Sequence, residues 1–262
     1  MNDLSHSFHQ QRSVGKIVLS VTATGLQRLR EEGSAKVRFP QMGREAILIN
    51  TGGGLAGGDD FKFDIEVGAN AQLTVTTQAA ERVYRTLGPA ALVHTQLKVA
   101  DGATLFWLPQ ESILFDGSSL SRKLDVALEA NSRFIAVEPV LFGRPESGEV
   151  ITQIAFRDCW RVQQNGKLIY ADDLHVDGLL PLSKATLNGA AAMATLLCIS
   201  PDAEHHLEAL RAAIGPHGAA SFWNGKLVAR LIARDGFTLR KALIPALAVL
   251  AGADSLPKVW SF

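Results

Sequence analysis

The sequence repeats itself at intervals of about 30 residues, and this repeat restricts the fold more than any other feature. Residues 65–73, 97–105 and 126–134 align with one another, and each combines an alternating apolar strand, a small polar turn and a second strand. Residues 160–168 form a looser fourth copy around an Asn-Gly pair, the strongest short signal for a hairpin turn. Repeats of this length are typical of stacked units that bury a continuous core between neighbours.

The repeat predicts a mainly β fold. We expect layered antiparallel sheets built from successive hairpins, stacked in the manner of a solenoid, with two or three short α-helices. A second Asn-Gly pair, at residues 224–225, predicts one more hairpin. A short helix or turn is compatible with Leu26 and Leu29. Residues 1–12 are expected to form a flexible leader, and residues 13–262 a single domain.

Two helices are predicted near the C-terminus. Residues 200–202 supply a helix cap and a proline for the first turn, and Gly215 with the following proline ends that helix. The second helix should run from about residue 238 to residue 251, with a kink or break at Pro245.

Composition excludes several classes of function. The 262-residue chain carries 26 basic and 26 acidic residues, so it has no overall field that would attract nucleic acid or an anionic membrane. The N-terminus lacks the order of a signal peptide, and no apolar run reaches about 18 residues, so we expect a cytoplasmic protein. Cys159 and Cys198 stand alone among apolar or aromatic neighbours, which favours free thiols over a disulfide or a metal site.

A glycine-rich stretch at residues 50–60 has the glycine spacing of two nucleotide-binding motifs, but the residues that follow the glycines do not fit either motif. A dinucleotide site needs a helix after the glycines, but the polar-apolar alternation that follows predicts a strand. Gly53 and Gly58 have the spacing of a P-loop, but Asp59 and Asp60 occupy the positions of the required lysine and hydroxyl residue. The stretch is therefore interpreted either as a tight packed turn or as a functional surface.

Several separated segments carry a resemblance to a known family. They are residues 50–59, 76–85, 107–111, 142–149 and 256–260. Together, and in this order from about Ser13 to the C-terminus, they resemble the urease accessory protein UreD family, called UreH in some species. The residues of these segments that we assign to family motifs or interfaces are Gly53, Gly54, Gly57, Gly58, Tyr84, Arg85, Pro109, Gln110, Gly143, Arg144, Glu149 and Trp260. Residues 145–147 (Pro-Glu-Ser) depart from the smaller or less polar residues common in the family.

The resemblance implies a maturation factor without catalytic activity of its own. Members of the family bind urease apoprotein and the partner UreF, and through UreF the GTPase UreG, and they help insert nickel into the urease active site. A dimer within the accessory complex is compatible with this role. The resemblance implies no tightly bound cofactor, only transient Ni²⁺, and it leaves GTP hydrolysis to UreG, in agreement with the failed P-loop pattern.

Acidic residues within these segments suggest a passage for nickel, because scattered carboxylates bind Ni²⁺ more weakly than clusters of Cys and His. The candidate metal-contacting residues are Asp59 and Asp60 after the glycines, Glu111, Glu138, which is a charged residue in an apolar strand before Pro139, and His175. Glu81 is a further acid of the family segments. The alternative for each acid is a salt bridge, with nearby arginines as partners. For His175, which lies in an Asp-rich stretch, the alternative is a polar strand exit.

Other interpretations stay open at this stage. A β-solenoid enzyme acting on a carbohydrate polymer could use paired carboxylates such as Asp59 and Glu111. An adaptor without metal contact is a third function. Tyr84 and Arg85 suit a protein interface, and Trp260 suits either an anchor for a partner or a contact with the chain's own core.

Overall fold

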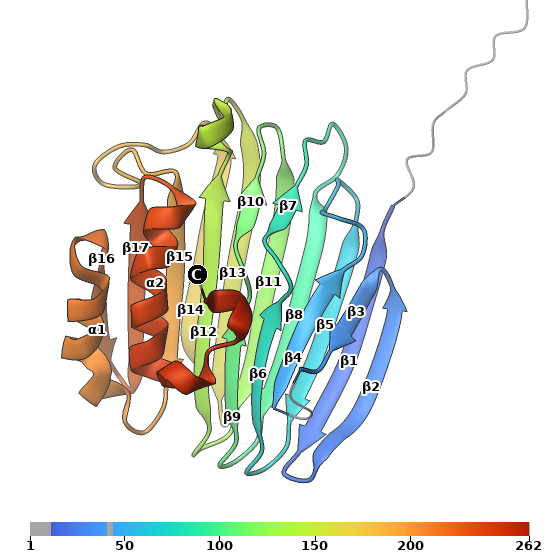
Figure 1. Ribbon diagram of the computed structural model, residues 1–262, viewed down its shortest axis with the longest axis vertical. Helices are drawn as coiled ribbons and strands as arrows, with labels where there is room; N and C mark the ends of the chain where they lie inside the picture. The colour runs from blue at the N-terminus through green and yellow to red at the C-terminus, as the bar shows by residue number, and fades with distance from the viewer. Residues whose placement is uncertain (1–11, 41–43, 262) are drawn as a thin grey trace, which may run out of the picture.

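The computed structural model describes residues 12–40 and 44–261 of the chain. Apart from Arg12, the expected leader at residues 1–12 lies outside the described residues, as does Phe262. Within the described part, two β-sheets are stacked face to face and two α-helices lie against one of them (Figure 1). The predicted mainly β, layered and solenoid-like fold with few helices is therefore confirmed.

Sheet 1 has the strand order β14-β13-β11-β8-β5-β1-β2. Its strands are β1 (Val14–Thr22), β2 (Gly25–Gly33), β5 (Asp60–Val67), β8 (Ala91–Val99), β11 (Ser119–Leu128), β13 (Ile154–Gln164) and β14 (Lys167–Gly178). The stretch around Leu26 and Leu29, considered as a short helix or turn, is strand β2, which pairs antiparallel with β1.

Sheet 2 has the order β16-β17-β15-β12-β9-β6-β4-β3, and β10 joins β12 to the short strand β7. Its strands are β3 (Ala35–Arg38), β4 (Glu45–Asn50), β6 (Gln72–Thr77), β7 (Glu81–Val83), β9 (Thr104–Leu108), β10 (Ser112–Leu114), β12 (Arg133–Phe142), β15 (Ala192–Ile199), β16 (Gly218–Trp223) and β17 (Lys226–Ala233).

The three aligned repeats form arches between the sheets. In each repeat the first strand belongs to sheet 1 and the second to sheet 2, as in β5 and β6, β8 and β9, and β11 and β12. Successive copies then pair in parallel within each sheet. This pairing corrects the antiparallel hairpins expected within the repeats. The alternating pattern could not distinguish parallel arches from antiparallel hairpins. In either arrangement a strand packs one face against the core, and its other face is exposed or covered by another element.

Hydrogen bonds between neighbouring turns hold the arches in register. The backbone N–H of Asp101 donates to the Glu129 carboxylate (2.7 Å), and the backbone and side-chain amides of Asn131 donate to the Asp101 carboxylate (3.1 and 2.9 Å). Asn70 occupies the matching turn of the first repeat with a positive φ of 57°. Small polar residues therefore recur in these turns because they cap the backbone and tolerate left-handed conformations.

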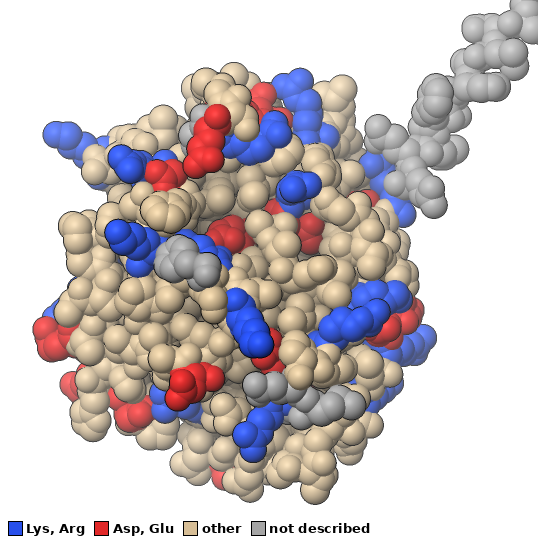
Figure 2. Space-filling view, viewed as in Figure 1, with Lys and Arg blue, Asp and Glu red and all other residues tan. Residues whose placement is uncertain are grey.

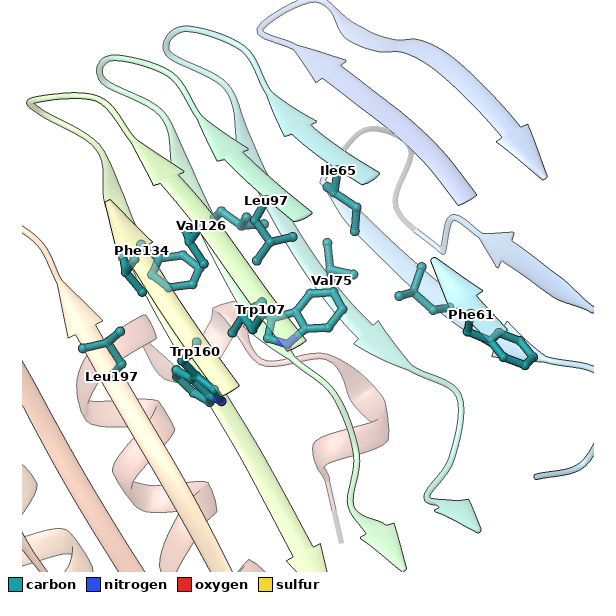
Figure 3. Packing of buried hydrophobic residues seen from close by; sticks show 14 of the residues in the cluster. Phe61, Ile65, Val75, Leu97, Trp107, Val126, Phe134, Trp160 and Leu197 are labelled. Atoms are coloured by element: carbon teal, nitrogen blue, oxygen red, sulfur yellow. The ribbon is translucent and has the colours of Figure 1, made fainter. Parts of the chain in front are cut away.

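The core lies between the facing sides of the two sheets (Figure 3). Its labelled members include Ile65, Leu97, Val126 and Trp160 from sheet 1, and Val75, Trp107, Phe134 and Leu197 from sheet 2. Full burial of each large apolar side chain contributes roughly 1.5–3 kcal/mol. The packed arches therefore supply the rigid frame on which the connections are mounted.

The helices cover the outer face of sheet 2 at its β15–β17 side (Figure 1). Helix α1 (Leu207–Ile214) ends at Gly215, as predicted. It begins later than the cap expected at residues 200–202, because residues Ala203–His206 form a 3₁₀ turn. Helix α2 (Gly236–Ala251) begins after Asp235, whose side chain accepts a hydrogen bond from the Thr238 N–H (2.6 Å). It runs through Pro245 without the expected break. Neither helix in the described part of the chain combines the length and apolar character needed to cross a membrane.

Both predicted Asn-Gly hairpins are confirmed. Asn165 and Gly166 join β13 to β14, and Asn224 and Gly225 join β16 to β17, with antiparallel pairing in both cases. The two cysteines are free thiols, as expected. Burial raises the pKa of the Cys198 thiol to about 11, which makes it a poor nucleophile.

Candidate functional site

The long connections between repeats gather at one end of the molecule, which we call the loop end. Because sheet 1 strands from β1 to β13 run parallel and the arches return the chain through sheet 2, each later connection emerges at this same end. The loop end consists of residues 51–59, 78–90, 109–118, 143–153 and 179–191. The central segments that carry the family resemblance are thereby brought together in space.

The glycine-rich connection is fixed to the segment around β7. Leu55 N–H donates to the Arg82 carbonyl (2.7 Å), and Tyr84 N–H donates to the Leu55 carbonyl (2.8 Å). The Tyr84 hydroxyl donates to the carbonyl of Gly53 (3.0 Å). At Gly54, where φ is +147°, a Cβ would lie 2.4 Å from the Tyr84 ring. A glycine is required there because both the backbone conformation and the space exclude a side chain.

Asp59 and Asp60 complete this connection in different ways. The buried Asp59 carboxylate accepts hydrogen bonds from the N–H groups of Ser13 (2.7 Å) and Ala56 (2.8 Å), so it closes the turn. Gly57 and Gly58 lie within the same turn, in which Gly58 N–H donates to the Ala90 carbonyl (3.2 Å). Asp60 begins β5 and forms an ion pair with Lys62 (2.9 Å).

A cavity of about 350 Å³ lies between the two sheets beside these connections. Sheet 1 contributes the lining residues Phe61, Phe63, Val93, Thr95, Leu120 and Arg122. Sheet 2 and its connections contribute Leu48–Asn50, Gly53–Leu55, Thr77–Arg82, Trp107, Pro109, Gln110, Ser112 and Glu138. The lining thus combines apolar walls with two acidic side chains, Glu81 and Glu138.

Glu81 is held by Asn50, the last residue of β4. The Asn50 side-chain amide donates to the Glu81 carboxylate and lies 3.3 Å from each of its oxygens. Burial raises the pKa of Glu81 to about 7, although the Asn50 hydrogen bond opposes this effect; the charge of Asp59 adds to it. Glu81 can therefore exchange a proton near neutral pH or, once ionised, accept a cation.

A buried ionic cluster forms the inner part of the cavity. Arg122 of β11 donates two hydrogen bonds to the neighbouring Asp158 carboxylate (3.0 and 2.7 Å) and reaches across the sandwich to Glu138 of β12. Trp107 Nε1–H donates to the other oxygen of Glu138 (2.8 Å). The Arg122 guanidinium also donates to the Ser112 hydroxyl (3.2 Å). The cluster joins the two sheets at the point where the cavity meets the apolar core.

Glu138 is the less well compensated carboxylate of this cluster. Burial raises its pKa, and although the Arg122 charge opposes the rise, the nearby Asp158 charge reinforces it. Arg122 stays charged, since its two carboxylate partners outweigh the effect of burial on its pKa. One cation therefore faces two carboxylates at the end of the cavity.

Helix α2 supports another wall. Arg240 donates to the side-chain oxygen of Gln110 (2.8 Å) and forms an ion pair with the buried Glu111 (3.2 Å). The buried Gln110 Nε2 has no hydrogen-bond partner among residues 12–40 and 44–261. The same arginine lies over the ring of Trp260 (5.0 Å from its centre), whose Nε1–H donates to the Leu108 carbonyl (2.9 Å). Trp260 is buried, so it contacts the chain's own core.

Ion pairs order the outer connections of the loop end. Arg85 pairs with Asp116 (2.9 Å), whose carboxylate also accepts hydrogen bonds from the backbone of Thr152 (2.6 Å) and Gln153 (3.0 Å). These bonds, led by that from the Thr152 backbone, lower the pKa of Asp116 to about 2. Arg144 pairs with Glu149 (3.1 Å) across the 143–153 connection.

Comparison with known proteins identifies the family. The family model described as UreD urease accessory protein matches residues 13–261. The chain belongs to the UreD urease accessory protein family.

Relatives of the same name match over nearly their whole length. "Urease accessory protein UreD" of Agrobacterium fabrum is 45% identical, with 99% of this chain and 95% of the relative covered. "Urease accessory protein UreD 1" of Brucella anthropi is 47% identical, with 90% of this chain and 89% of the relative covered. A UreD of Rhizobium leguminosarum bv. viciae is 43% identical over the whole of both chains.

The sequence-based candidates separate into groups in this UreD-family structure. Glu138 lines the cavity, whereas Glu111 is bound by Arg240 outside the lining and Asp59 lies within the glycine turn. His175 is an exposed residue of β14, opposite Arg157, and is not among the cavity-lining residues. In the described part of the chain, no three His, Cys, Asp or Glu side chains lie close enough together to hold a metal ion.

Arg122, which lines the cavity of this UreD-family chain, and its buried partner Asp158 were not selected from the sequence. Arg122 occupies an inward position in the alternating stretch Ser119–Leu128, and a charged residue at such a position was the available signal. Asp158 interrupts the inward face of β13 in the same way. Both are recognisable once the strands are known to be neighbours, because a buried charge requires a partner. Asn50 gave no comparable signal.

Proposed function

We propose that this chain is a non-catalytic scaffold of urease maturation in the cytoplasm. It binds urease apoprotein and UreF, through UreF it associates with the GTPase UreG, and it assists GTP-dependent insertion of nickel into urease. Membership in the UreD family and relatives that carry the name urease accessory protein support this role. The observation that supports it best is that the central family segments surround one cavity with two acidic side chains.

We further propose that Ni²⁺, as cargo, passes transiently through this cavity. Glu81 and Glu138 would offer carboxylate oxygens, which hold Ni²⁺ more weakly than clustered Cys and His and so permit release. Asp59 and Glu111 enter the proposal as residues that fix the walls, given their bonds to backbone amides and to Arg240. Asp60 and His175 do not line the cavity and are not part of the proposed passage.

The first experiment is co-expression of the chain with UreF, and separately with urease apoprotein, followed by capture, size exclusion and metal analysis. The proposal predicts stable complexes with both proteins, and nickel-loaded urease only when this chain is present. If the chain bound neither protein while another UreD bound both under the same conditions, the proposed function would be abandoned.

Two carboxamide variants test the passage itself. Glu81→Gln and Glu138→Gln keep the size of the side chains but remove the charges, so each should lower the nickel content of urease while complex formation continues. Asp60→Asn is the matched control, because Asp60 lies at the same end but outside the cavity. Normal nickel loading with both cavity variants would instead support an adaptor without metal contact.

A carbohydrate-active enzyme is not proposed. The paired-carboxylate alternative relied on Asp59 and Glu111, and each is already engaged. The two oxygens of Asp59 accept backbone N–H groups, and Glu111 pairs with Arg240. A glycosidase would need one of its two carboxyl groups free to act as an acid and the other free to act as a base or nucleophile.

A further inference from the structure

Exposed apolar side chains project from successive connections of the loop end. Leu87, Val150 and Leu179 are all exposed, and each lies on a different connection. The connections adjoin one another through backbone pairing. Residues 84–90 meet residues 115–118 where Thr86 N–H donates to the Gly117 carbonyl (3.0 Å). The Gly117 N–H in turn donates to the Gln153 carbonyl (2.7 Å).

The row continues to the 179–191 connection. Ile154 at the start of β13 pairs with Gly178 at the end of β14, so residue 150 and residue 179 lie on neighbouring connections. At its other end the 179–191 connection meets β17, because Ala191 N–H donates to the Ala233 carbonyl (3.1 Å). Arg234 follows directly. The apolar side chains and Arg234 therefore belong to one contiguous end surface.

In three ion pairs of this surface the arginine side chain is more exposed than the carboxylate. In the Arg85–Asp116 pair the arginine side chain is 68% exposed and the carboxylate 18%. In the Arg144–Glu149 pair the values are 48% and 15%, and in the Arg234–Asp235 pair they are 86% and 26%. The acids are thus tucked inward and the guanidinium groups face outward. These three pairs therefore present guanidinium groups to solvent, beside one exposed acid of the 143–153 connection, Glu146.

We propose that this end surface, the loop-end face formed by Leu87, Val150, Leu179, Arg85, Arg144 and Arg234, docks an acidic protein surface with an apolar centre. Exposed apolar side chains beside outward-facing arginines are typical of protein interfaces, in which arginine is enriched and complementary charge speeds association. The inference rests on the proposed function, because it assigns the face to a partner in urease maturation.

The position of the face explains why docking there would matter. Arg82 lines the cavity, and Arg85 follows it on the same connection, so the face adjoins the place where the cavity meets the loop end. In the upper half of Figure 2 some acidic side chains are set back while others lie at the surface, and Lys and Arg side chains protrude beside them. A protein bound at this face would cover the cavity mouth and shield the recessed acids from solvent.

The test uses the full chain with UreF and with urease apoprotein as separate probes, and measures binding across a salt series. The variant Arg85→Gln/Arg144→Gln/Arg234→Gln should weaken binding of the docking protein about tenfold or more at low salt. The difference should shrink toward 1 M salt, where the screening length falls to about 3 Å. The matched control Arg28→Gln/Lys98→Gln/Lys167→Gln neutralises three exposed cations remote from the loop end and should bind as the wild type.

A second variant addresses the apolar part of the face without disturbing any ion pair. Leu87→Asn/Val150→Asn/Leu179→Asn should weaken binding of the same protein at all salt concentrations, since these side chains are exposed and their replacement leaves the fold intact. Wild-type affinity of both face variants for both probes would overturn the inference while leaving the proposed function standing. Failure of the wild type to bind either probe would remove the proposed function and the inference together.

A membrane is the other anionic surface that such a face could meet. Vesicles with phosphatidylserine provide the third arm of the experiment. Binding of the wild type to these vesicles, lost in both face variants while capture of the two proteins is unchanged, would overturn the protein docking proposed above. Absence of vesicle binding, together with loss of protein capture, would support it.

Discussion

The Asn50 amide lies 3.3 Å from each carboxylate oxygen of Glu81, and it joins the end of β4 to the start of β7. The same amide donates to the Gly54 carbonyl (3.0 Å), while the Asn50 oxygen accepts the Gly52 N–H (2.8 Å). One side chain therefore both closes the glycine-rich turn and orients an acid in the cavity. A glycine run that resembled a phosphate-binding loop in sequence instead serves to position a carboxylate.

The elevated pKa of Glu81 predicts a pH-dependent effect on stability. Its folded pKa of about 7 exceeds the ordinary value of 4.5, so the folded state binds the proton more tightly than the unfolded state. The ionised group thus destabilises the fold progressively as the pH rises from 4.5 to about 7. Glu81→Gln should increase the free energy of unfolding at pH 8, by roughly 3 kcal/mol at most, and should have little effect near pH 4.5.

Urea unfolding of the wild type and the variant across this pH range measures the effect. Glu66→Gln serves as the control because Glu66 is an exposed residue of β5. An equal change in stability at both ends of the pH range would mean that packing, and not ionisation, governs the Glu81 site.

Gly54 and Gly53 provide a matched test of the packed turn. Both have positive φ, but a Cβ at Gly54 would lie 2.4 Å from the Tyr84 ring and 2.8 Å from the Arg82 carbonyl oxygen, whereas at Gly53 it would meet nothing within 4 Å. Gly54→Ala should cost about 2–3 kcal/mol of stability through overpacking and strain. Gly53→Ala should cost about 1 kcal/mol, from backbone conformation alone. Denaturant midpoints of the two variants should differ accordingly, and equal midpoints would contradict the close contact.

The sequence predicted the architecture well but not the partners of its strands. The regular spacing of residues 65–73, 97–105 and 126–134 predicts stacked units, and the alternation of apolar and polar residues identifies the buried side chains. It does not say whether a turn returns the chain to the same sheet or to the opposite one, since both bury one face of each strand. Only the Asn-Gly turns, such as Asn165 with Gly166, carry a backbone preference specific enough to predict a hairpin.

The candidate site was predictable in location more than in chemistry. The family segments marked the loop end, and Glu138 was selected as a charged residue in an apolar strand. Its partner Arg122 lies 16 residues earlier and in the other sheet, so no local pattern connects the two. Which acids reach the cavity depends on side-chain direction at the strand ends. Sequence spacing could not distinguish Glu81, which lines the cavity, from Glu111, which does not.

Removal of Arg122 should be severely destabilising. The side chain compensates two buried carboxylates, so Arg122→Met would leave Glu138 and Asp158 without their cation. Breaking a buried ion pair from one side typically costs about 3–5 kcal/mol. The triple variant Arg122→Met/Glu138→Gln/Asp158→Asn removes the charges together and should recover most of the loss. Chemical denaturation of both variants checks this, and a triple variant as unstable as the single one would show that shape and not charge dominates.

Substitutions of the buried Trp260 and of the partly exposed Trp223 compare a core tryptophan with a surface one. Trp260 is buried and its Nε1–H donates to the Leu108 carbonyl (2.9 Å), so Trp260→Ala should cost about 3–5 kcal/mol. Trp223 is 40% exposed at a hairpin end and contacts Lys226, so Trp223→Ala should cost about 1 kcal/mol or less. Thermal unfolding should therefore show a much larger loss for Trp260→Ala. If instead that variant retained its stability and lost only partner capture, Trp260 would be an anchor for a partner and not a member of the core.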